Sequence, residues 1–440
     1  QKRSIEMRGV LSGVVPLRWR QAVNFGLMYV SYMCFYFARK NYAFWLNELV
    51  QMGRDQKSLS VFGSVMEMSY GVGKLVSGPL VDSQSPLKVL VAVLVVSSVS
   101  NLLMFQTGFT VVDMALWSMN GLAQSAAWPA LAGIFMNWFK ASNNRGFWYS
   151  VLSTNQNLGS ALTPVLLMPL VADYGWQAAV IAPGLTGLAF SLILICFVQE
   201  ERDDDNKLEK VDGPAPSTSA AKSRSAPKPQ EVGWQQTLVE MLTSVDLLSL
   251  GLGYAFLTLV RVGMQDWSLL LLSEIRGASS ETARDCLVAV ELGGFLGALS
   301  AGAISDRLFN GRRGPAMVLF TGAIAPTILA IAWMPITKVT AWWTLTGLYF
   351  LFGFLSFGPH MLVGLASREV FTKAPSTAGS FTKSLAQAGG TFAGYPLSVA
   401  VSNFGWASVP FLFAACSALG AIGFLPLLWS AAENRKQKQQ

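Results

Sequence analysis

Two arginines lie inside long apolar segments of the chain, Arg39 in YFARKNYAF and Arg261 in RVGMQDW. A charge at the centre of a bilayer costs at least about 2.5 kcal/mol on insertion scales, so a charge kept there often serves a site. Guanidinium presents a planar fork of donors that matches a phosphate or a carboxylate. Two such forks on opposite walls of one cavity suit a dianionic phosphate. We therefore predict that Arg39 and Arg261 bind the phosphoryl group of a substrate.

Each arginine has a second charged residue close by in the sequence. Lys40 directly follows Arg39 and points about 100° away from it around a helix. Asp266 follows Arg261 in the matching segment of the second half of the chain. By the symmetry of the two segments, Asp266 can reach Lys40 across their interface. We predict a Lys40–Asp266 ion pair with a structural or gating role.

A further apolar segment carries Glu67, Tyr70 and Lys74 on one helical face, because their spacing follows the helical repeat. Glu291, in the second half of the chain, supplies another carboxylate. Two interpretations of Lys74 stay open. Either Lys74 and Tyr70 line the substrate path, or Glu67 and Glu291 bind Lys74 in structural or gating ion pairs, which we favour.

Four polar residues within apolar segments are candidates for contacting the organic part of a substrate. Lys383, in FTKSLAQAGG, has no obvious acidic partner within its own segment. Gln124, Gln156 and Gln387 carry amides that can hydrogen-bond hydroxyl groups in a cavity. Amides in transmembrane helices more commonly bond neighbouring helices to each other, so this second interpretation stays open.

The segment GAISDRLFNGRR predicts a conformational latch at a cytoplasmic loop. In it, Asp306 can cap a helix end, while Arg307 and Arg312 can donate to neighbouring carbonyl groups. Enzyme chemistry is not indicated, because the chain has a single histidine, His360, and no HExxH motif. We expect no metal, no cofactor and no catalytic residue, and we interpret His360 as a core histidine.

The composition indicates which elements position these residues. The chain is 52% hydrophobic and only 13% charged, about half the charge of a soluble domain. Roughly twelve apolar windows are long enough to cross a bilayer, which takes about 20 residues each. The four cysteines are scattered without metal-ligand spacing. These features predict an all-α membrane protein with roughly twelve transmembrane helices.

The distribution of charge predicts the topology. Lys and Arg gather at alternate loop ends, which places both termini in the cytoplasm. The net charge of +7 then comes mostly from basic residues at the cytoplasmic loop ends, and it does not indicate nucleic-acid binding. Residues 200–233 are charged and then rich in Pro, Ala and Ser, which predicts a disordered cytoplasmic linker. The predicted parts are a cytoplasmic segment 1–21, six-helix bundles 22–199 and 234–431, and a basic cytoplasmic tail 432–440.

The two halves look like repeats of each other. Arg39, GPLVD, WP and QNLG of the first half recur as Arg261, GAISD, GP and QAGG, between 222 and 231 residues later. The offset increases smoothly along the chain, as small loop insertions would produce. Two related six-helix halves joined by a central linker are the layout of the major facilitator fold, in which the substrate binds between the halves.

The chain resembles the organophosphate:phosphate antiporter family of the major facilitator superfamily in both halves. The resemblance lies in YFARKNYAF, YGVGKLVSGPLVD, NGLAQSAAWPA, RVGMQDW, ELGGFLGALSAGAISDR, FGPHMLVG and AGSFTKSLAQAGGTFAG. NGLAQ and the LST…NL segment are most similar to the glucose-6-phosphate members of the endoplasmic reticulum. The resemblance implies phosphate binding by Arg39 and Arg261, a substrate path near Lys74, and exchange of a sugar phosphate for inorganic phosphate. It also implies the endoplasmic reticulum or another organellar membrane.

The chain departs from this family pattern at three places. Gln156 stands where bacterial glycerol-3-phosphate members have histidine, and Arg261 stands where the reticulum members have lysine. The Trp-Pro-Pro-Cys of the family is Trp128-Pro129-Ala130-Leu131 in this chain. These departures leave the organic substrate open, with glucose 6-phosphate favoured.

Other functions compatible with the sequence belong to different classes. One is a proton-coupled organic-anion or sugar symporter with Glu67 or Glu291 as the proton site. Another is a phosphate sensor on a transporter fold, and a membrane phosphatase is disfavoured by the lack of a nucleophile or metal centre. The expected partners are a small phosphorylated metabolite, inorganic phosphate and the lipid bilayer, with no nucleic acid. Nothing in the sequence requires more than a monomer.

Overall fold

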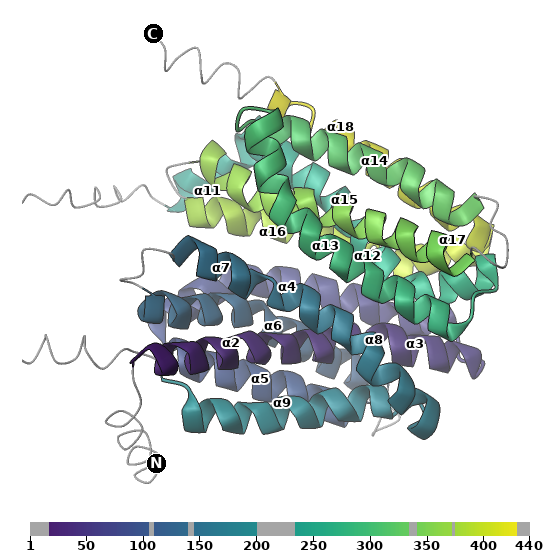
Figure 1. Ribbon diagram of the computed structural model, residues 1–440, viewed down its shortest axis with the longest axis horizontal. Helices are drawn as coiled ribbons and strands as arrows, with labels where there is room; N and C mark the ends of the chain where they lie inside the picture. Colours follow the sequence, from purple (N-terminus) through teal and green to yellow (C-terminus); the bar gives the residue numbers. More distant parts are fainter. Residues whose placement is uncertain are drawn as a thin grey trace, which may run out of the picture.

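The computed structural model describes residues 17–104, 110–139, 145–199, 234–333, 341–371 and 375–428. Within these ranges the chain is helical, and its helices form two groups that lie one above the other (Figure 1). The predicted linker 200–233 and tail 432–440 lie outside the described residues, as does most of the predicted segment 1–21. The all-helical architecture expected from the composition is confirmed.

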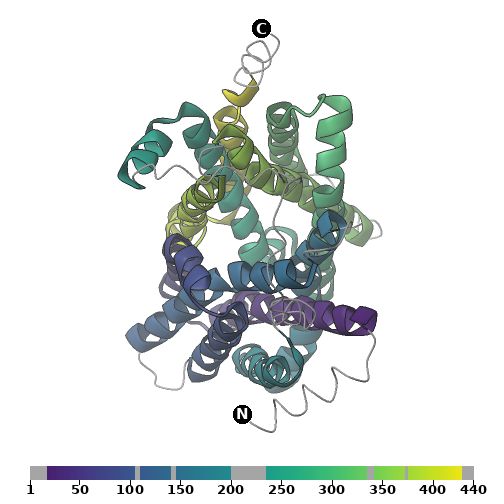
Figure 2. The ribbon, with the colours of Figure 1, turned by 90° about the vertical axis from the view of Figure 1, so that its left-hand side faces the viewer.

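Each group is a bundle from one half of the chain. The first bundle comprises α2 (Leu17–Lys40), α3 (Tyr42–Gln51), α4 (Gln56–Ser83), α5 (Pro86–Leu103), α6 (Thr110–Phe139), α7 (Arg145–Ser153), α8 (Asn155–Tyr174) and α9 (Ala178–Phe197). The second comprises α11 (Trp234–Thr243), α12 (Val245–Arg276), α13 (Ser280–Leu308), α14 (Arg313–Trp333), α15 (Ala341–Val370), α16 (Pro375–Thr391), α17 (Tyr395–Phe404), η1 (Trp406–Ser408) and α18 (Val409–Gly423). Figure 2 shows the two bundles end-on.

Among the described residues, seven helical segments are long and apolar enough to cross a membrane. They lie in α5, α9, α12, α13, α14, α15 and the η1–α18 segment. The other long helices include α2 and α4, which carry the charged residues predicted to form a site. The protein is thus an integral membrane protein, and two of the long helices outside this set carry charged residues of the predicted site.

Local sequence explains where several helices begin and end. The Asp55 side chain accepts hydrogen bonds from the backbone of Lys57 and Ser58 at the start of α4. Hydrogen bonds from the Ser58 hydroxyl and backbone hold the pKa of the Asp55 carboxyl below its ordinary value. Ser85 caps α5 in the same way, with Pro86 at the first helical position. Gly277 ends α12 with φ of 57°, a left-handed conformation that favours glycine.

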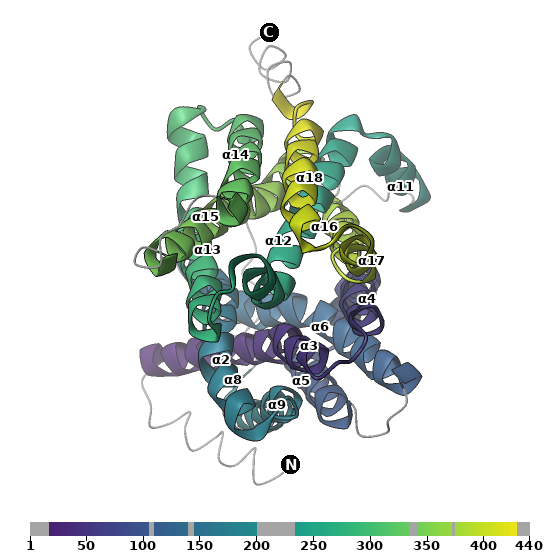
Figure 3. The same cartoon turned by 90° about the vertical axis from the view of Figure 1, so that its right-hand side faces the viewer.

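The two bundles meet mainly through α3 with α12, α4 with α16 and α17, and α8 with α13. We call the end of the molecule where α9 ends and α11 begins the linker side, and the opposite end the far side (Figure 1). Figure 3 views the molecule from the far side, where α3, α4, α12 and α17 lie close together.

Hydrogen bonds join the bundles on the far side. Ser60 donates to the Ser398 hydroxyl at 2.6 Å, and Ser64 donates to the Thr391 carbonyl at 2.6 Å. The contact nearest the linker side along α4 is that of Ser384 with the carbonyl of Gly71, at 3.4 Å. Within the described ranges, the hydrogen bonds between the bundles therefore run from the far side to about mid-depth.

A close backbone approach on the far side gives a test of this packing. Any Cβ added to Gly394 would meet the backbone nitrogen and the hydroxyl of Ser64, whereas a Cβ at Gly347 would meet nothing within 4 Å. Overpacking costs about 1–3 kcal/mol. We expect Gly394→Ala to lower the thermal unfolding midpoint of the detergent-purified protein below that of Gly347→Ala. Equal midpoints for the two variants would contradict this packing.

Candidate substrate-binding site

Arg39 lies at the end of α2 and forms an ion pair with Glu67 of α4. Its Nη2 atom is 2.6 Å from Glu67 Oε1, and the side chains are only 13% and 5% exposed. The other carboxylate oxygen, Oε2, accepts a hydrogen bond of 2.5 Å from the Gln387 amide of α16. Glu67 therefore binds Arg39 within its own bundle and Gln387 in the other bundle. The prediction that Glu67 binds Lys74 is wrong, because Arg39 from a separate helix occupies the carboxylate.

Lys40 and Asp266 form the ion pair expected from the sequence. Lys40 Nζ lies 3.2 Å from Asp266 Oδ1, with side chains 14% and 12% exposed. The pair joins α2 of the first bundle to α12 of the second. A small pocket lies beside both ion pairs and is lined by Arg39, Lys40, Tyr42, Gly63, Met66, Glu67, Trp117 and Asp266. Residues of both bundles thus surround one charged region.

Arg261 of α12 has a different environment from Arg39. Its Nη1 atom donates to the Gln265 amide oxygen at 3.4 Å, and its guanidinium carbon lies 5.3 Å from the centre of the Phe357 ring. Its buried Nε atom has no hydrogen-bond partner in the structure. No carboxylate of the described residues forms an ion pair with Arg261. Arg261 is therefore a half-buried cation with donors available for an anion.

Two tyrosines, Tyr36 and Tyr70, lie close to these charged side chains. The Tyr70 ring lies 4.4 Å from the Arg39 guanidinium carbon and 4.8 Å from Lys74 Nζ. Tyr36 lies within electrostatic range of both Arg39 and Arg261, and it donates to the Gln156 amide oxygen at 3.1 Å. The two arginines therefore share one region between the bundles.

Among the described residues, no carboxylate forms an ion pair with Lys74. Its Nζ atom donates to the Ser125 carbonyl at 2.8 Å and lies over the Tyr70 ring. Glu291, the second acid expected for Lys74, instead accepts from the amides of Gln265 at 2.5 Å and Asn157 at 3.2 Å. The ion-pair interpretation of Lys74 is therefore wrong, and its position beside Tyr70 agrees with the open alternative of a substrate path.

The three predicted amides have different surroundings. Gln156 contacts Tyr36, and Gln387 contacts Glu67, so both face the charged region. Gln124 is buried inside the first bundle, where its amide donates to Asn120 at 2.9 Å and to Ser97 at 3.3 Å. The structure thus corrects the placement of Gln124 on the substrate path, because its amide bonds α6 to α5.

Lys383 of α16 lies half-buried within electrostatic range of Tyr70 and His360. It therefore lies on the second bundle at the same interface as Tyr70 of the first. This position agrees with the expectation that Lys383 faces the organic part of a substrate.

The predicted latch is built differently from the sequence expectation. Asp306 is exposed and pairs with Arg313 Nη1 at 2.6 Å, while Arg313 Nη2 lies 3.6 Å from Glu369. Arg312 donates to the Leu428 carbonyl at 3.0 Å, as expected for an arginine near helix ends, and Arg307 is exposed. The capping role given to Asp306 is wrong, because the Arg313 guanidinium of the same segment binds its carboxylate.

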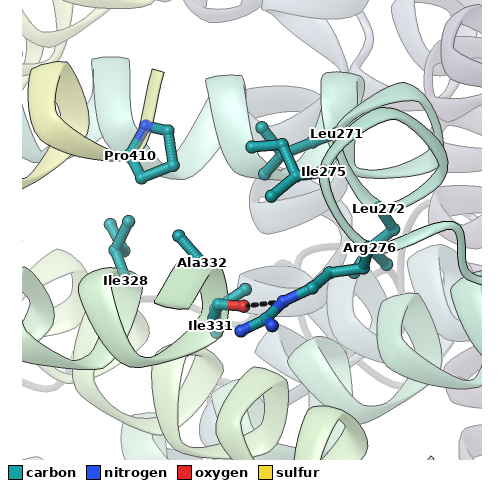
Figure 4. A pocket seen from close by; sticks show the side chains of 8 residues that line it. All are labelled: Leu271, Leu272, Ile275, Arg276, Ile328, Ile331, Ala332 and Pro410. Atoms are coloured by element: carbon teal, nitrogen blue, oxygen red, sulfur yellow. Dashed lines mark hydrogen bonds between the residues drawn. The ribbon is translucent and has the colours of Figure 1, made fainter. Parts of the chain in front are cut away.

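A second pocket lies wholly within the second bundle (Figure 4). Its lining is apolar except for Arg276, whose Nε donates to the Ile331 carbonyl at 2.7 Å near the end of α14. The Arg276 guanidinium is thus used to satisfy a helix terminus. Arg276 Nη2 also donates to the Ala330 carbonyl at 3.3 Å, so this pocket has the features of bundle packing.

Two helical bundles, one from each half of the chain, with charged residues between them, have the layout of transporters whose substrate binds between two related halves. The chain matches the Major Facilitator Superfamily over residues 28–394 and belongs to that superfamily. It is therefore a transport protein of this superfamily and not an enzyme.

Several bacterial proteins are similar to nearly the whole chain. It is 33% identical over 433 residues to the probable hexose phosphate transport protein of Chlamydia pneumoniae, covering 96% of this chain and 93% of that protein. It is 29% identical over 418 residues to the membrane sensor protein UhpC of Escherichia coli strain K12, covering 93% and 92%. It is 26% identical over 431 residues to the glycerol-3-phosphate transporter of Bacillus subtilis, covering 95% and 94%.

Solved structures show the same fold at low identity. A bacterial homolog of the human lysosomal transporter Spinster, in an inward-facing and unoccupied conformation, has a TM-score of 0.64 and 13% identity, covering 94% of this chain and 96% of that one. The nucleoside transporter NupG has a TM-score of 0.66 and 11% identity, covering 94% and 100%. At these identities the likeness concerns the fold alone.

Proposed function

We propose that this protein exchanges a phosphorylated hexose for inorganic phosphate across a membrane by alternating access. The observation that carries the proposal is the pair Arg39 and Arg261, one from each bundle. Both arginines are close enough to Tyr36 to act on it electrostatically. The relatives named for hexose phosphate and glycerol 3-phosphate transport support an organophosphate substrate. An anion between the bundles would contact both of them, as alternating access requires.

The charge balance of the interface supports a dianionic ligand. Among the described residues, five cations and three carboxylates lie in this region, an excess of two positive charges when all are ionised. The cations are Arg39, Lys40, Lys74, Arg261 and Lys383, and the acids are Glu67, Asp266 and Glu291. A phosphate group at pH 7 carries about −1.5 to −2 charges. A bound phosphate would therefore neutralise the interface nearly completely.

The Arg39–Glu67 pair changes how phosphate binding is expected to proceed. From the sequence we expected two arginines on opposite walls of one cavity, and Arg39 already has an anionic partner in Glu67. In our proposal phosphate first meets Arg261, which has no acid, and then takes the place of the Glu67 carboxylate on Arg39. Glu67 keeps Gln387 as a hydrogen-bond partner during this exchange.

This arrangement gives a physical reason for obligatory exchange. Closing the bundles over an empty site would bury uncompensated positive charge, at a cost of several kcal/mol. A bound phosphate removes that cost. The binding site can therefore switch its opening from one side of the membrane to the other only when phosphate is bound. A ligand shifts such an equilibrium only through its different affinity for the two states.

The finer features of the proposal follow from the family resemblance and from the charge distribution. We propose glucose 6-phosphate as the organic substrate, both termini in the cytoplasm, and a monomer as the working unit. The endoplasmic reticulum is the proposed location by resemblance, although the relatives reported above come from bacteria.

Counterflow in proteoliposomes tests the proposed function directly. Vesicles loaded with inorganic phosphate should take up labelled glucose 6-phosphate, and vesicles without internal phosphate should not. Uptake that follows an imposed pH gradient and ignores internal phosphate would replace antiport by the proton-coupled symporter. That alternative would use Glu67 or Glu291. Within the described ranges, Glu291 accepts hydrogen bonds from the neutral amides of Asn157 and Gln265.

A second candidate function is a phosphate-ester sensor. The observation that favours it is the 29% identity to a membrane sensor protein over most of both chains. A sensor would bind glucose 6-phosphate with the same residues but would not carry it. Binding in detergent without counterflow in vesicles would therefore support the sensor over the antiporter.

A further inference from the structure

The second bundle contains a tyrosine–histidine pair beside Arg261. The Tyr254 hydroxyl of α12 lies 2.7 Å from His360 Nδ1 of α15, and the two ring centroids are 5.3 Å apart. Tyr254 is buried, while His360 is half-buried. The hydrogen bond fixes the orientation of the imidazole ring. From the sequence His360 is predicted to be a core histidine, and no sequence motif singles out Tyr254.

This pair faces the interface between the bundles. Tyr254 lies within electrostatic range of Arg261 and also of Tyr36 and Tyr70, which belong to the first bundle. His360 lies within electrostatic range of Arg261 and of Lys383. The pair is therefore beside the proposed phosphate site.

Phe357 links the pair to the arginine. Phe357 precedes His360 by about one turn of α15 and lies under the Arg261 guanidinium at 5.3 Å. Its ring centroid is 6.0 Å from that of His360. Arg261, Phe357 and His360 thus form one continuous wall of the second bundle.

The position of Tyr254 on α12 allows the pair to contact the end of a substrate that is farthest from a phosphate bound at Arg261. Tyr254 precedes Arg261 by two helical turns, about 10 Å along the helix axis toward the linker side. A phosphate bound at Arg261 would place the far end of a hexose at this depth, whereas a three-carbon ester is too short to reach it. A tyrosine hydroxyl and an imidazole each donate and accept hydrogen bonds, as sugar hydroxyls do.

We propose that Tyr254 and His360 form the subsite that recognises the hydroxyl groups of the hexose, and that this subsite determines the preference for hexose phosphates over shorter phosphate esters. This inference rests on the proposed function, because it assumes a phosphate at Arg261. Tyr254 orients the imidazole, and His360 contacts the sugar.

Calorimetric titration of the full-length protein in detergent tests the subsite with three probes: inorganic phosphate, glycerol 3-phosphate and glucose 6-phosphate. His360→Ala should raise the Kd for glucose 6-phosphate about 10-fold more than the Kd for inorganic phosphate, because one to two hydrogen bonds are lost. Tyr254→Phe should act in the same direction with a smaller effect. Tyr395→Phe, on the exposed far side, is the matched control and should leave the three affinities in their wild-type ratios.

The outcomes separate this inference from the proposed function. Equal increases of all three Kd values in His360→Ala would indicate a structural role and overturn the subsite. An unchanged Kd for glucose 6-phosphate would also overturn it while leaving the phosphate site intact. Failure of the wild-type protein to bind inorganic phosphate would instead overturn the proposed function itself.

Discussion

Replacing Arg261 with alanine is expected to reduce phosphate self-exchange in proteoliposomes by at least about 30-fold. Loss of one partner of a buried charge-assisted contact costs about 2–5 kcal/mol, and each 1.4 kcal/mol is a factor of ten. Arg261 has no carboxylate ion-pair partner within the described residues, so its removal breaks no described ion pair. The loss should therefore reflect the ligand site rather than misfolding.

Two variants give this experiment its controls. Arg276→Ala removes another arginine of α12, which donates to the Ile331 carbonyl, and should retain most of the exchange. Arg261→Lys keeps the charge but loses the planar fork, so it should recover only part of the rate. Exchange at the wild-type rate by Arg261→Ala, in protein that is properly folded, would contradict phosphate binding at this residue.

Arg39 requires a different design. Arg39→Ala alone would leave Glu67 buried without its cationic partner, which is destabilising in its own right. The double variant Arg39→Ala with Glu67→Gln removes both charges together. This double variant is therefore the appropriate comparison with Arg261→Ala.

The fold could be predicted from the sequence because its signals are long and repeated. The apolar windows are each about as long as a membrane span, and four motifs recur in register between the halves. The same symmetry led to the Lys40–Asp266 pair, which the structure contains at 3.2 Å. Symmetry is informative here because it relates residues that are far apart in the chain.

The partners of Glu67, Lys74 and Glu291 could not be obtained in this way. Spacing along one helix shows which residues share a face, but it does not show which side chain a neighbouring helix brings to that face. Glu67 and Lys74 share a face of α4, yet Arg39 of α2 binds the acid and the Ser125 carbonyl binds the lysine.

Gln124 and the Tyr254–His360 pair show the same limit for uncharged residues. An amide in an apolar segment is equally compatible with a cavity and with helix packing, and Gln124 takes the second role. The Tyr254–His360 contact joins residues more than one hundred positions apart on α12 and α15. No periodic pattern relates them, so only the packing of the bundle could bring them together.

Glu67→Gln is expected to lower the Kd for inorganic phosphate by about 10-fold, or about 1.4 kcal/mol. Glu67 competes with an incoming anion for Arg39, and glutamine removes the competing charge while its amide oxygen can still accept from Gln387. Arg39 keeps its contact with the Tyr70 ring at 4.4 Å, so the guanidinium stays in place. Calorimetric titration with inorganic phosphate measures the change.

The same variant should exchange phosphate more slowly. Without the Glu67 carboxylate, the interface with bound phosphate carries one more positive charge than in the wild type. In addition, no carboxylate is left to take the place of phosphate on Arg39 when phosphate is released. Glu291→Gln is the matched control, because it removes a carboxylate of the same interface that is bonded to Gln265 and Asn157 but not to Arg39. An equal gain of affinity in Glu291→Gln would assign the effect to net charge alone. An unchanged or weaker affinity in Glu67→Gln would show that phosphate does not displace this carboxylate from Arg39.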